Sequence, residues 1–230
     1  MSQAFQHTEG IILRAIPFRD HDQILSLFTP DAGMIKVLCK GSRNKRRGIQ
    51  GLCIPLTKVE VVYREKRGEI FSCQELTPVD SLSFLRKELI YLEVACDLLQ
   101  VIIASQLMGK AAPQLYVLLS IYLKKIPQTF NPWILAASFR LKLLKHDGLA
   151  VFPFICSDCQ QFLQTAAYTQ ESEGWCVNHQ PVGSQAWEQN ELQQLYRLAC
   201  CQNYREICAD EISFSLQNKV AHFFDECVKR

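Results

Sequence analysis

The stretch GIILRAIPFRDHDQILSLFTPDAGMIKVLCK, residues 10–40, decides the fold of the first third of the chain. It holds three short apolar runs, GIILRAIPF, QILSLFT and GMIKVLCK, with a Pro-Asp-Ala-Gly turn signal at residues 30–33 between the last two. Two more runs, LTKVEVVYRE and EIFSCQE, lie on either side of a Lys-Arg-Gly turn at residues 66–68. Strands at such close spacing predict a small β-barrel, and its longest loop is expected at residues 41–55.

The period of the apolar residues changes after residue 78, from two to about 3.6. Steps of three or four positions join the members of one stripe and predict a single long helix: Leu82, Leu85, Leu89, Leu92, Cys96, Leu99 and Ile103. Four more helices are expected further along, at residues 113–126, 132–148, 184–201 and 213–228. The sequence thus predicts an α+β protein with a barrel domain at 1–78 and a mainly helical domain at 79–230.

The N-terminus, MSQAFQHTEG, has no charged segment followed by an apolar run, so a cytoplasmic location without a secretory signal is expected. The longest apolar stretch, residues 94–108, is interrupted by Asp97 and Gln100 and is too short to span a bilayer. In such a chain the 11 cysteines are expected to be thiols or metal ligands rather than disulfides. The cysteines without paired spacing are expected to be core or surface thiols: Cys39, Cys53, Cys73, Cys96, Cys200, Cys201, Cys208 and Cys227.

The formal net charge of +2 is unevenly divided along the chain. Residues 1–78 carry 12 Lys and Arg against 8 Asp and Glu, which gives +4, and the remainder carries 13 against 15, which gives −2. From Lys36 to Lys58 there are seven basic residues and no acid. This asymmetry predicts that the barrel domain binds an anion and that the helical domain does other work.

The stretch LCKGSRNKRRGIQG, residues 38–51, concentrates the basic side chains between two glycines that give the backbone freedom. Residues of this kind contact backbone phosphates rather than base edges, which favours nucleic acid bound without sequence specificity. Arg14 and Arg19 flank the first strand and are expected to extend the groove. The predicted nucleic-acid-binding residues are Arg14, Arg19, Lys36, Lys40, Arg43, Lys45, Arg46 and Arg47. The alternative is a solvated charged face with no ligand.

Bases of a single strand usually stack on aromatic rings. Phe18, Phe28, Tyr63 and Phe71 are candidates, although aromatic residues of a small barrel are more often part of its core. Motifs for catalysis are missing from the sequence: it contains no Walker A motif, no dinucleotide turn, no Gly-x-Ser-x-Gly and no His-Glu-x-x-His. Asp-His-Asp at residues 20–22 is a poor catalytic triplet, because His21 would point away from both acids in a strand. An enzymatic function is therefore not expected.

Residues 156–179 contain Cys-x-x-Cys, 16 further residues and Cys-x-x-His, which is the spacing of a zinc site. Cys156, Cys159, Cys176 and His179 would fill all four tetrahedral positions, so a zinc ion here would be structural rather than catalytic. Two alternatives are a redox pair of thiols and a Cys176/His179 nucleophile pair. The first has no βαβ context, and the second has no orienting acid that the sequence reveals.

Taken together, these residues resemble the bacterial recombination mediator family RecO, whose members are DNA repair proteins. The resemblance is most specific in GIILRAIPFRDHDQILSLFTPDAGMIKVLCKGSRNKR and continues in GLCIPLTKVEVVY and in the Cys-x-x-Cys pair after Phe-Pro. It implies an OB-fold barrel followed by a helical domain with a zinc-ribbon-like element at 152–181. The family's fourth metal ligand is normally Cys, and His179 stands in its place here.

The resemblance also implies a function. Proteins of this family bind single- and double-stranded DNA, anneal complementary strands, and work with RecR and the single-strand DNA-binding protein to load the recombinase, without breaking a bond. The acidic tail of the single-strand DNA-binding protein would need an apolar notch edged by basic residues, which the segment 140–145 could form if it is more than a core helix.

Two other classes remain open. The chain could be a zinc-stabilised scaffold that binds RNA or an acidic protein, or a Cys-dependent hydrolase or redox protein.

Overall fold

The computed structural model describes residues 5–42, 53–65 and 68–229. The chain forms two compact units, Met1–Leu123 and Lys124–Arg230. The first unit contains the barrel and the helices that follow it, and the second contains the remaining helices and a small sheet. The sequence predicted a boundary at residue 78 between the barrel and the helices, which is a different division from that into compact units. The predicted boundary stays a prediction.

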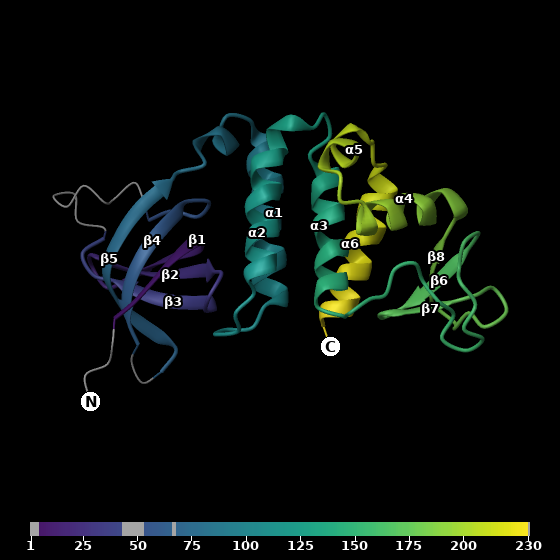
Figure 1. Ribbon diagram of the computed structural model, residues 1–230, viewed down its shortest axis with the longest axis horizontal. Coiled ribbons are helices and arrows are strands. Elements are labelled where there is room, and N and C mark those ends of the chain that lie inside the picture. Colours follow the sequence, from purple (N-terminus) through teal and green to yellow (C-terminus); the bar gives the residue numbers. More distant parts are fainter. Residues whose placement is uncertain (1–4, 43–52, 66–67, 230) are drawn as a thin grey trace. The chain divides into compact units, whose positions relative to one another are not determined.

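The N-terminal part is a closed barrel of five strands in the order β1-β2-β3-β5-β4 (Figure 1). The strands are β1 Phe5–Phe18, β2 Asp22–Thr29, β3 Gly33–Cys39, β4 Lys58–Arg64 and β5 Ile70–Asp80. Neighbouring strands are antiparallel except β3 and β5, which are parallel. This is the five-stranded barrel of an OB-fold, as the sequence predicted.

The strand sequences alternate between the barrel interior and its outer surface. Leu25 and Leu27 of β2 and Ile35 and Val37 of β3 are buried in one core cluster, and the residues between them point outward. The first strand pairs with β2 along its second half and with β4 along its first half, and its register shifts between Ile12 and Arg14. This shift allows the one long strand β1 to pair with both β2 and β4 and so to close the barrel.

The turn between β2 and β3 is fixed by its own side chains and by the chain after α1. The Thr29 hydroxyl donates to the Gly33 carbonyl at 2.9 Å and accepts from the Ala32 amide at 3.2 Å. Gly33 has φ +61°, and a Cβ atom built on it would lie 1.9 Å from the carbonyl oxygen of Lys110. The Gly109 amide donates to the Met34 carbonyl at 2.9 Å. Only glycine fits at residue 33, because both the backbone angle and the close approach require it.

The prediction of a single long helix at 82–103 is wrong. Leu82 has φ +44° and precedes a short 3-10 helix, η2 (Ser83–Arg86), and α1 (Leu89–Ser105) begins only after that. Leu89, which the predicted stripe placed on the buried face, is the first residue of α1 and is exposed. The residues of α1 that are buried are Val94, Ala95, Leu98, Leu99, Val101 and Ile102. The next helix, α2 (Pro113–Lys125), begins at the proline that the sequence indicated.

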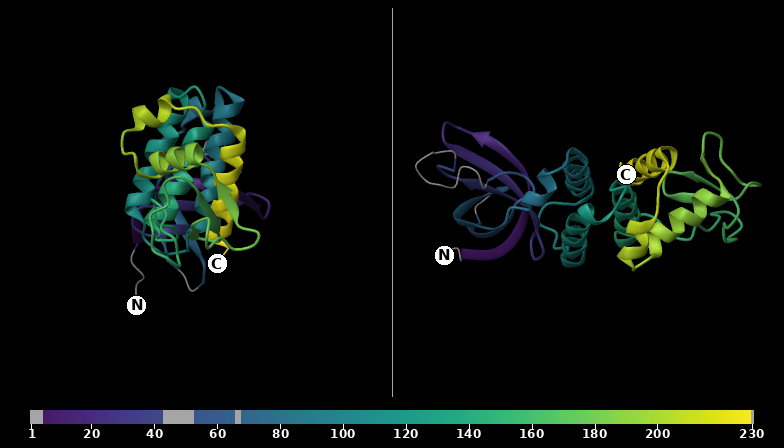
Figure 2. Two further views of the ribbon diagram at one scale, coloured as in Figure 1. Left: turned by 90° about the vertical axis from the view of Figure 1, so that its right-hand side faces the viewer. Right: turned by 90° about the horizontal axis from the view of Figure 1, so that it is seen from above.

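The second unit is mainly helical, as expected. Its elements are η3 Ile126–Gln128, α3 Trp133–His146, β6 Ala167–Gln170, β7 Glu173–Trp175, β8 Gln185–Trp187, α4 Gln189–Cys200, α5 Tyr204–Ala209 and α6 Phe214–Val228. Figures 1 and 2 show α3 and α6 lying side by side. The helix expected at 184–201 is shorter, because its first residues form β8, which pairs with β6 in the sheet β7-β6-β8. The short helix α5 was not predicted.

Among the residues that the structure describes, every helix is too short or too polar to cross a lipid bilayer.

Candidate metal centre and nucleic-acid surface

The four residues with zinc-ligand spacing meet at one point in the second unit. Cys156 and Cys159 lie on a tight turn after Phe154, and Cys176 and His179 follow β7. The turn is closed by the Gln160 amide, which donates to the Cys156 carbonyl at 2.9 Å, while Gln160 itself has φ +58°. The ligand atoms of all four residues lie within 4.8 Å of one another.

The distances between these atoms fit a tetrahedral metal ion. The Cys159 and Cys176 sulfurs are 3.9 Å apart, and Nδ1 of His179 lies 3.6 Å from the Cys156 sulfur and 3.3 Å from the Cys176 sulfur. A tetrahedral zinc with Zn–S of about 2.3 Å and Zn–N of about 2.05 Å places its sulfurs about 3.8 Å apart and a sulfur and nitrogen about 3.6 Å apart. The chain thus forms a ligand set suited to a thiophilic divalent metal.

Groups around Cys156 favour its metal-binding thiolate form. Burial by itself raises the pKa of the Cys156 thiol, but the backbone amides of Cys159, Cys176 and Asp158, together with His179, lower this pKa to about 6. The Cys176 amide donates to the Cys156 sulfur at 3.4 Å. A thiolate that receives several N–H groups is ready to bind a cation.

The structure supplies an acid for His179 that sequence reasoning missed. A carboxylate oxygen of Asp158 lies 3.4 Å from Nε2 of His179, while Nδ1 faces the sulfurs. A carboxylate on the outer nitrogen is usual for a metal-bound histidine. The Asp158 carboxylate would also orient His179 as the base of a Cys176/His179 nucleophile pair. However, Nδ1 of His179 faces the sulfurs of both Cys156 and Cys176, and this arrangement favours a metal site over such a pair.

Tyr196 of α4 holds both chain segments that lead into the turn. Its hydroxyl donates to the Leu163 carbonyl at 2.7 Å and accepts from the Phe154 amide at 3.1 Å. On the other side, Gly174 of β7 accepts from the Ser157 amide at 2.9 Å. A Cβ atom at Gly174 would lie 3.0 Å from the Phe154 Cβ, so a side chain there would require the strand or Phe154 to shift by a few tenths of an ångström.

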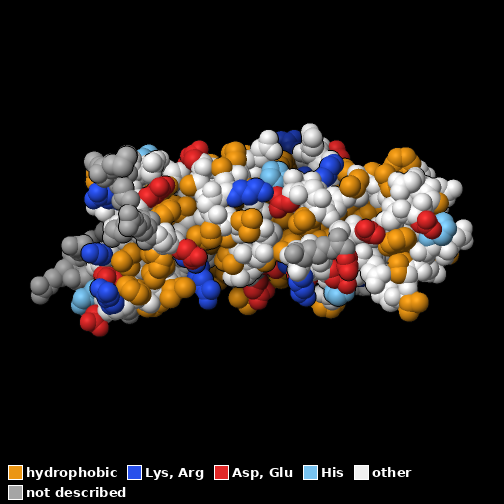
Figure 3. Space-filling view, turned by 90° about the horizontal axis from the view of Figure 1, so that it is seen from below, with side chains coloured by type: hydrophobic (Ala, Val, Ile, Leu, Met, Phe, Trp, Pro, Cys, Tyr) orange, Lys and Arg blue, Asp and Glu red, His pale blue; other side chains and the backbone are white. Residues whose placement is uncertain are grey.

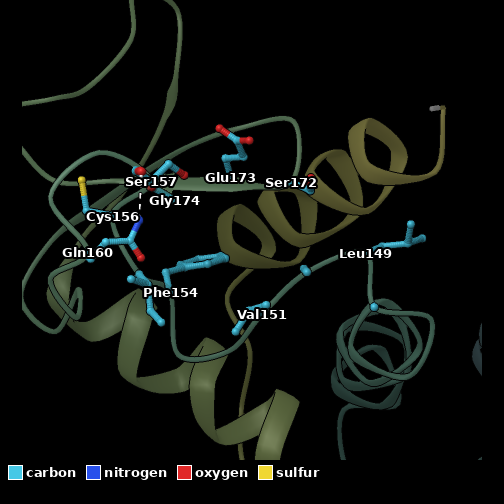
Figure 4. A pocket seen from close by; sticks show the side chains of 12 residues that line it. Leu149, Val151, Phe154, Cys156, Ser157, Gln160, Ser172, Glu173 and Gly174 are labelled. Atoms are coloured by element: carbon cyan, nitrogen blue, oxygen red, sulfur yellow. Dashed lines mark hydrogen bonds between the residues drawn. The ribbon is translucent and has the colours of Figure 1, made fainter.

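A cavity of about 360 Å³ lies beside the turn (Figure 4). Ser157 and Gln160 line it from the turn, and the side-chain amide of Gln160 donates from Nε2 to the Ser157 carbonyl at 3.0 Å. Leu149 and Val151 line it from the segment after α3, and Glu173 comes from β7. Cys156 also lines the cavity, which therefore borders the candidate metal centre rather than forming a separate site.

Two of the predicted nucleic-acid-binding residues lie in one row on the outer surface of the barrel. Arg14 of β1 is paired with Ser26 of β2, and Ser26 is paired with Lys36 of β3. Arg14 is exposed and Lys36 is half-buried, and each lies beside a residue that packs into the barrel core. Lys36 Nζ also lies 3.3 Å from a carboxylate oxygen of Glu69.

The other predicted basic residues lie at the ends of this surface or outside the described residues. Arg19, at the turn between β1 and β2, has its guanidinium carbon 5.2 Å from the centre of the Phe18 ring. Lys40 is exposed directly after β3, where the Gly41 amide donates to Asp22 at 2.8 Å. Four predicted residues lie outside the residues that the structure describes: Arg43, Lys45, Arg46 and Arg47.

The aromatic candidates for base stacking belong mostly to the interior. Phe28 is fully buried and lies 6.0 Å from the ring of Tyr116. Tyr63 is buried and stacks on Phe71 at 5.4 Å inside the barrel. Phe71 is only half-buried, and Phe18, beside Arg19, is half-buried at the edge of the barrel.

The outer surface of the barrel carries aliphatic residues that sequence reasoning did not select. Ile16 pairs with Ile24, and Ile24 pairs with Leu38, in the row next to Arg14, Ser26 and Lys36. Ile16 is exposed, and the other two are half-buried. Hydrophobic side chains gather on the barrel with Lys and Arg beside them in Figure 3. The alternation of β2 and β3 in the sequence was the signal that could have revealed this row.

The segment 140–145 in α3 is a core helix. Its three leucines are fully buried: Leu141, Leu143 and Leu144. Lys142 Nζ donates to the Cys201 carbonyl at 2.6 Å, and Lys145 Nζ donates to the Cys200 sulfur at 3.5 Å. The apolar notch considered from the sequence is therefore not formed by these leucines.

Comparisons with known proteins agree on one family. The family model described as "Recombination protein O N terminal" matches residues 1–82, and the one described as "Recombination protein O C terminal" matches residues 86–221. A protein of Chlamydia pneumoniae named DNA repair protein RecO is 24% identical over 217 residues, which cover 94% of this chain and 86% of the relative. A protein of the same name from Alkaliphilus metalliredigens is 26% identical over 178 residues, 76% of this chain and 72% of the relative.

Similarity to one further relative is concentrated in a shorter stretch. A protein of Koribacter versatilis, also named DNA repair protein RecO, is 38% identical over 80 residues, 35% of this chain and 31% of the relative. The barrel, the helical unit and the metal-ligand cluster agree with the fold that the sequence predicted. Because models of one family match both parts of the chain, the chain belongs to the recombination protein O family, RecO.

Proposed function

We propose that this chain is a recombination mediator in bacterial DNA repair that binds single- and double-stranded DNA without sequence specificity and anneals complementary strands. The row Arg14, Ser26 and Lys36 on the outer barrel surface carries the proposal. An OB-fold binds nucleic-acid strands on one face of its barrel and the loops that border it. Arg14 and Lys36 lie on such an outer face of the barrel. In addition, relatives of the chain are named DNA repair proteins.

The proposed mechanism is electrostatic. Cations on a rigid barrel neutralise phosphates of two strands, which reduces the repulsion between the strands and lets base pairing proceed. The aromatic residues Phe28 and Tyr63 are buried, so base stacking would contribute little on this surface. Binding should therefore depend steeply on salt and weakly on sequence, and no covalent step is involved.

We infer that zinc is the metal at Cys156, Cys159, Cys176 and His179, and that it is structural. Four protein ligands leave no position for water or substrate, so the ion would hold the turn and β7 together rather than take part in a reaction. The turn is joined to α4 through Tyr196. Loss of the ion should then loosen this part of the second unit without removing the barrel.

The proposed partners besides DNA are RecR and the acidic tail of the single-strand DNA-binding protein, and the proposed outcome is loading of the recombinase in the cytoplasm. An acidic partner suits the basic surface of the barrel by charge. The partner surfaces are not assigned to residues, since the leucines of the segment 140–145 are buried.

A double variant tests the proposal. Arg14→Ala/Lys36→Ala should weaken binding to single-stranded DNA of any sequence, slow annealing, and reduce the slope of log affinity against log salt by about 1.4. The matched control is Arg205→Ala/Lys229→Ala, which removes the same charge from exposed positions of the second unit. Circular dichroism would check that both variants fold. An unchanged slope for the barrel variant would reject this surface as the DNA site.

The same titration separates the second candidate, a scaffold for RNA or an acidic protein. An RNA of the same sequence and an acidic peptide would be measured beside the DNA at two salt concentrations. Tighter binding of RNA or peptide than of DNA, with no annealing, would favour the scaffold.

A further inference from the structure

Three cysteines from separate parts of the barrel sequence line one cavity of about 150 Å³. The residues that line it are Cys39, Lys40, Ser42, Cys53, Cys73, Gln74 and Leu76. Cys39 is 5% exposed and Cys53 is 1% exposed, whereas Cys73 is half-buried and reaches the cavity from β5. Their spacing in the sequence indicated no site, because barrel closure alone brings them together.

The register of β3 and β5 places two of these cysteines opposite each other. Val37 pairs with Phe71 and Leu38 pairs with Ser72, so the next position along both parallel strands sets Cys39 opposite Cys73. Cys39 belongs to the barrel core, and Cys73 packs against the same core, so both side chains point inward. Neighbouring strands lie about 4.8 Å apart, and disulfides join Cα atoms about 4.4–6.8 Å apart.

The two thiols are chemically unequal. The interaction between the Cys39 and Cys73 thiols raises the pKa of Cys39, to which burial adds, and lowers the pKa of Cys73. Burial also raises the pKa of Cys53 to about 11. As a thiol, Cys73 can also donate to the Glu75 carbonyl at 3.5 Å. Cys73 is thus both the most accessible of the three and the one whose thiolate is favoured.

We propose that Cys39 and Cys73 are a peroxide-sensitive dithiol that forms a reversible disulfide across the parallel pair of strands in the barrel. The Cys73 thiolate attacks one oxygen of hydrogen peroxide, which forms an S–O bond, breaks the O–O bond and, with one proton, releases water. The Cys39 sulfur then attacks the Cys73 sulfur, forming the S–S bond and releasing the oxygen as a second water with the Cys39 proton. Two thiols and one peroxide give one disulfide and two waters.

The position gives this bond a structural effect. Among the described strands of the barrel, β3 and β5 are the parallel neighbours, and their pairing closes the cylinder. Cys39 is the last residue of β3 and directly precedes Lys40. A disulfide would fix this end of the strand.

The test is disulfide mapping of the full-length, zinc-loaded chain after a small molar excess of hydrogen peroxide. We expect a cross-linked peptide pair that contains Cys39 and Cys73, lighter by two hydrogens than the reduced pair and restored by dithiothreitol. Cys73 should lose its thiol about tenfold faster than Cys96. Cys96 is exposed at the surface, but partial desolvation of its sulfur raises its pKa. The oxidised barrel should also unfold at a temperature about 5 °C higher or more.

Variants make the result decisive. Cys73→Ser, at a half-buried position, should abolish both the cross-link and the shift in unfolding temperature, and the matched control Cys96→Ser should leave both intact. Cys39→Ala should stop oxidation at the sulfenic or sulfinic acid of Cys73. A cross-link from Cys73 to Cys53 instead of Cys39, or a Cys73 thiol that survives as long as Cys96, would overturn the proposal.

Discussion

Asp158 places a carboxylate oxygen 3.4 Å from Nε2 of His179, on the side of the imidazole that faces away from the cysteine sulfurs. The ring is therefore held between an acid and the ligand cluster, with Nδ1 aimed at the position of a metal ion. This arrangement would orient His179 as a fourth ligand beside the three cysteines.

Asp158→Ala should lower the affinity for zinc about 10- to 100-fold, because the imidazole loses the partner that fixes its orientation. Competition with a chromophoric chelator at constant pH measures the affinity. Asp225→Ala, at an exposed position of α6, is the control and should bind zinc like the unmodified chain. Equal affinities for all three proteins would mean that Asp158 has no role in metal binding.

Tyr196→Phe should lower the free energy of unfolding by about 1–3 kcal/mol, because the buried Phe154 amide and Leu163 carbonyl lose a shared partner. Burial raises the pKa of Tyr196 from 10.0 to about 12. The stabilisation of the folded state by the neutral Tyr196 hydroxyl is therefore complete below pH 10 and is lost as the pH rises through 12. Denaturant unfolding at pH 8 and at pH 11.5 should show a smaller difference between variant and parent at the higher pH. Tyr91→Phe in α1 is the control, and a pH-independent difference would contradict the assignment.

Gly33→Ala should destabilise the barrel by about 3 kcal/mol or more, since the left-handed backbone angle and the Lys110 carbonyl both oppose a side chain. Gly109→Ala separates the two causes, because Gly109 has φ +73° but a Cβ atom there would meet nothing within 4 Å. It should lose only about 1 kcal/mol. Thermal unfolding of both variants measures the difference, and similar losses would show that the turn moves away from residue 110 at little cost.

Glu69→Gln should raise the affinity for single-stranded DNA about two- to threefold at low salt, because Lys36 no longer shares its charge with a carboxylate 3.3 Å away. Fluorescence anisotropy against salt concentration measures it. The exposed Glu211→Gln in the second unit makes the same charge change and should have a smaller effect. If both variants gain equally, net charge rather than this ion pair controls binding.

Arg46→Ala/Arg47→Ala should weaken binding to all DNA sequences alike and flatten the salt slope by about 1.4 with single-stranded DNA and about 1.8 with duplex DNA, as expected for two lost phosphate contacts. The prediction rests on the sequence, because both residues lie outside the described part of the chain. A slope equal to that of the parent protein would remove the basic stretch from the binding surface.

The sequence predicted the barrel well because its strands alternate and its turns carry strong signals. It did not predict that β1 begins at Phe5 or that β5 runs to Asp80, because those ends are mostly exposed and owe their structure to pairing with β4. The prediction of one long helix at 82–103 was wrong because it also depended on local backbone structure that the apolar pattern does not encode. An apolar stripe cannot reveal that Leu82 adopts φ +44° and interrupts it.

The candidate sites divide in the same way. The metal ligands were predictable because their spacing is local, whereas Asp158 and Tyr196 contribute through contacts that only the folded chain creates. The pairing of Arg14 with Lys36 through Ser26 and the meeting of Cys39 with Cys73 both depend on strand register. Register arises from closure of the whole barrel and is not written in any short stretch.

The seating of the β2–β3 turn on the chain after α1 has a practical consequence for dissecting the molecule. A fragment cut at Pro78 would strip the support from Gly33 and leave Met34 without its backbone partner at Gly109. Such a piece would be prone to fraying at that hairpin. A cut near Leu123 keeps the support, and it is the better starting point for isolating the first unit as a self-sufficient fragment.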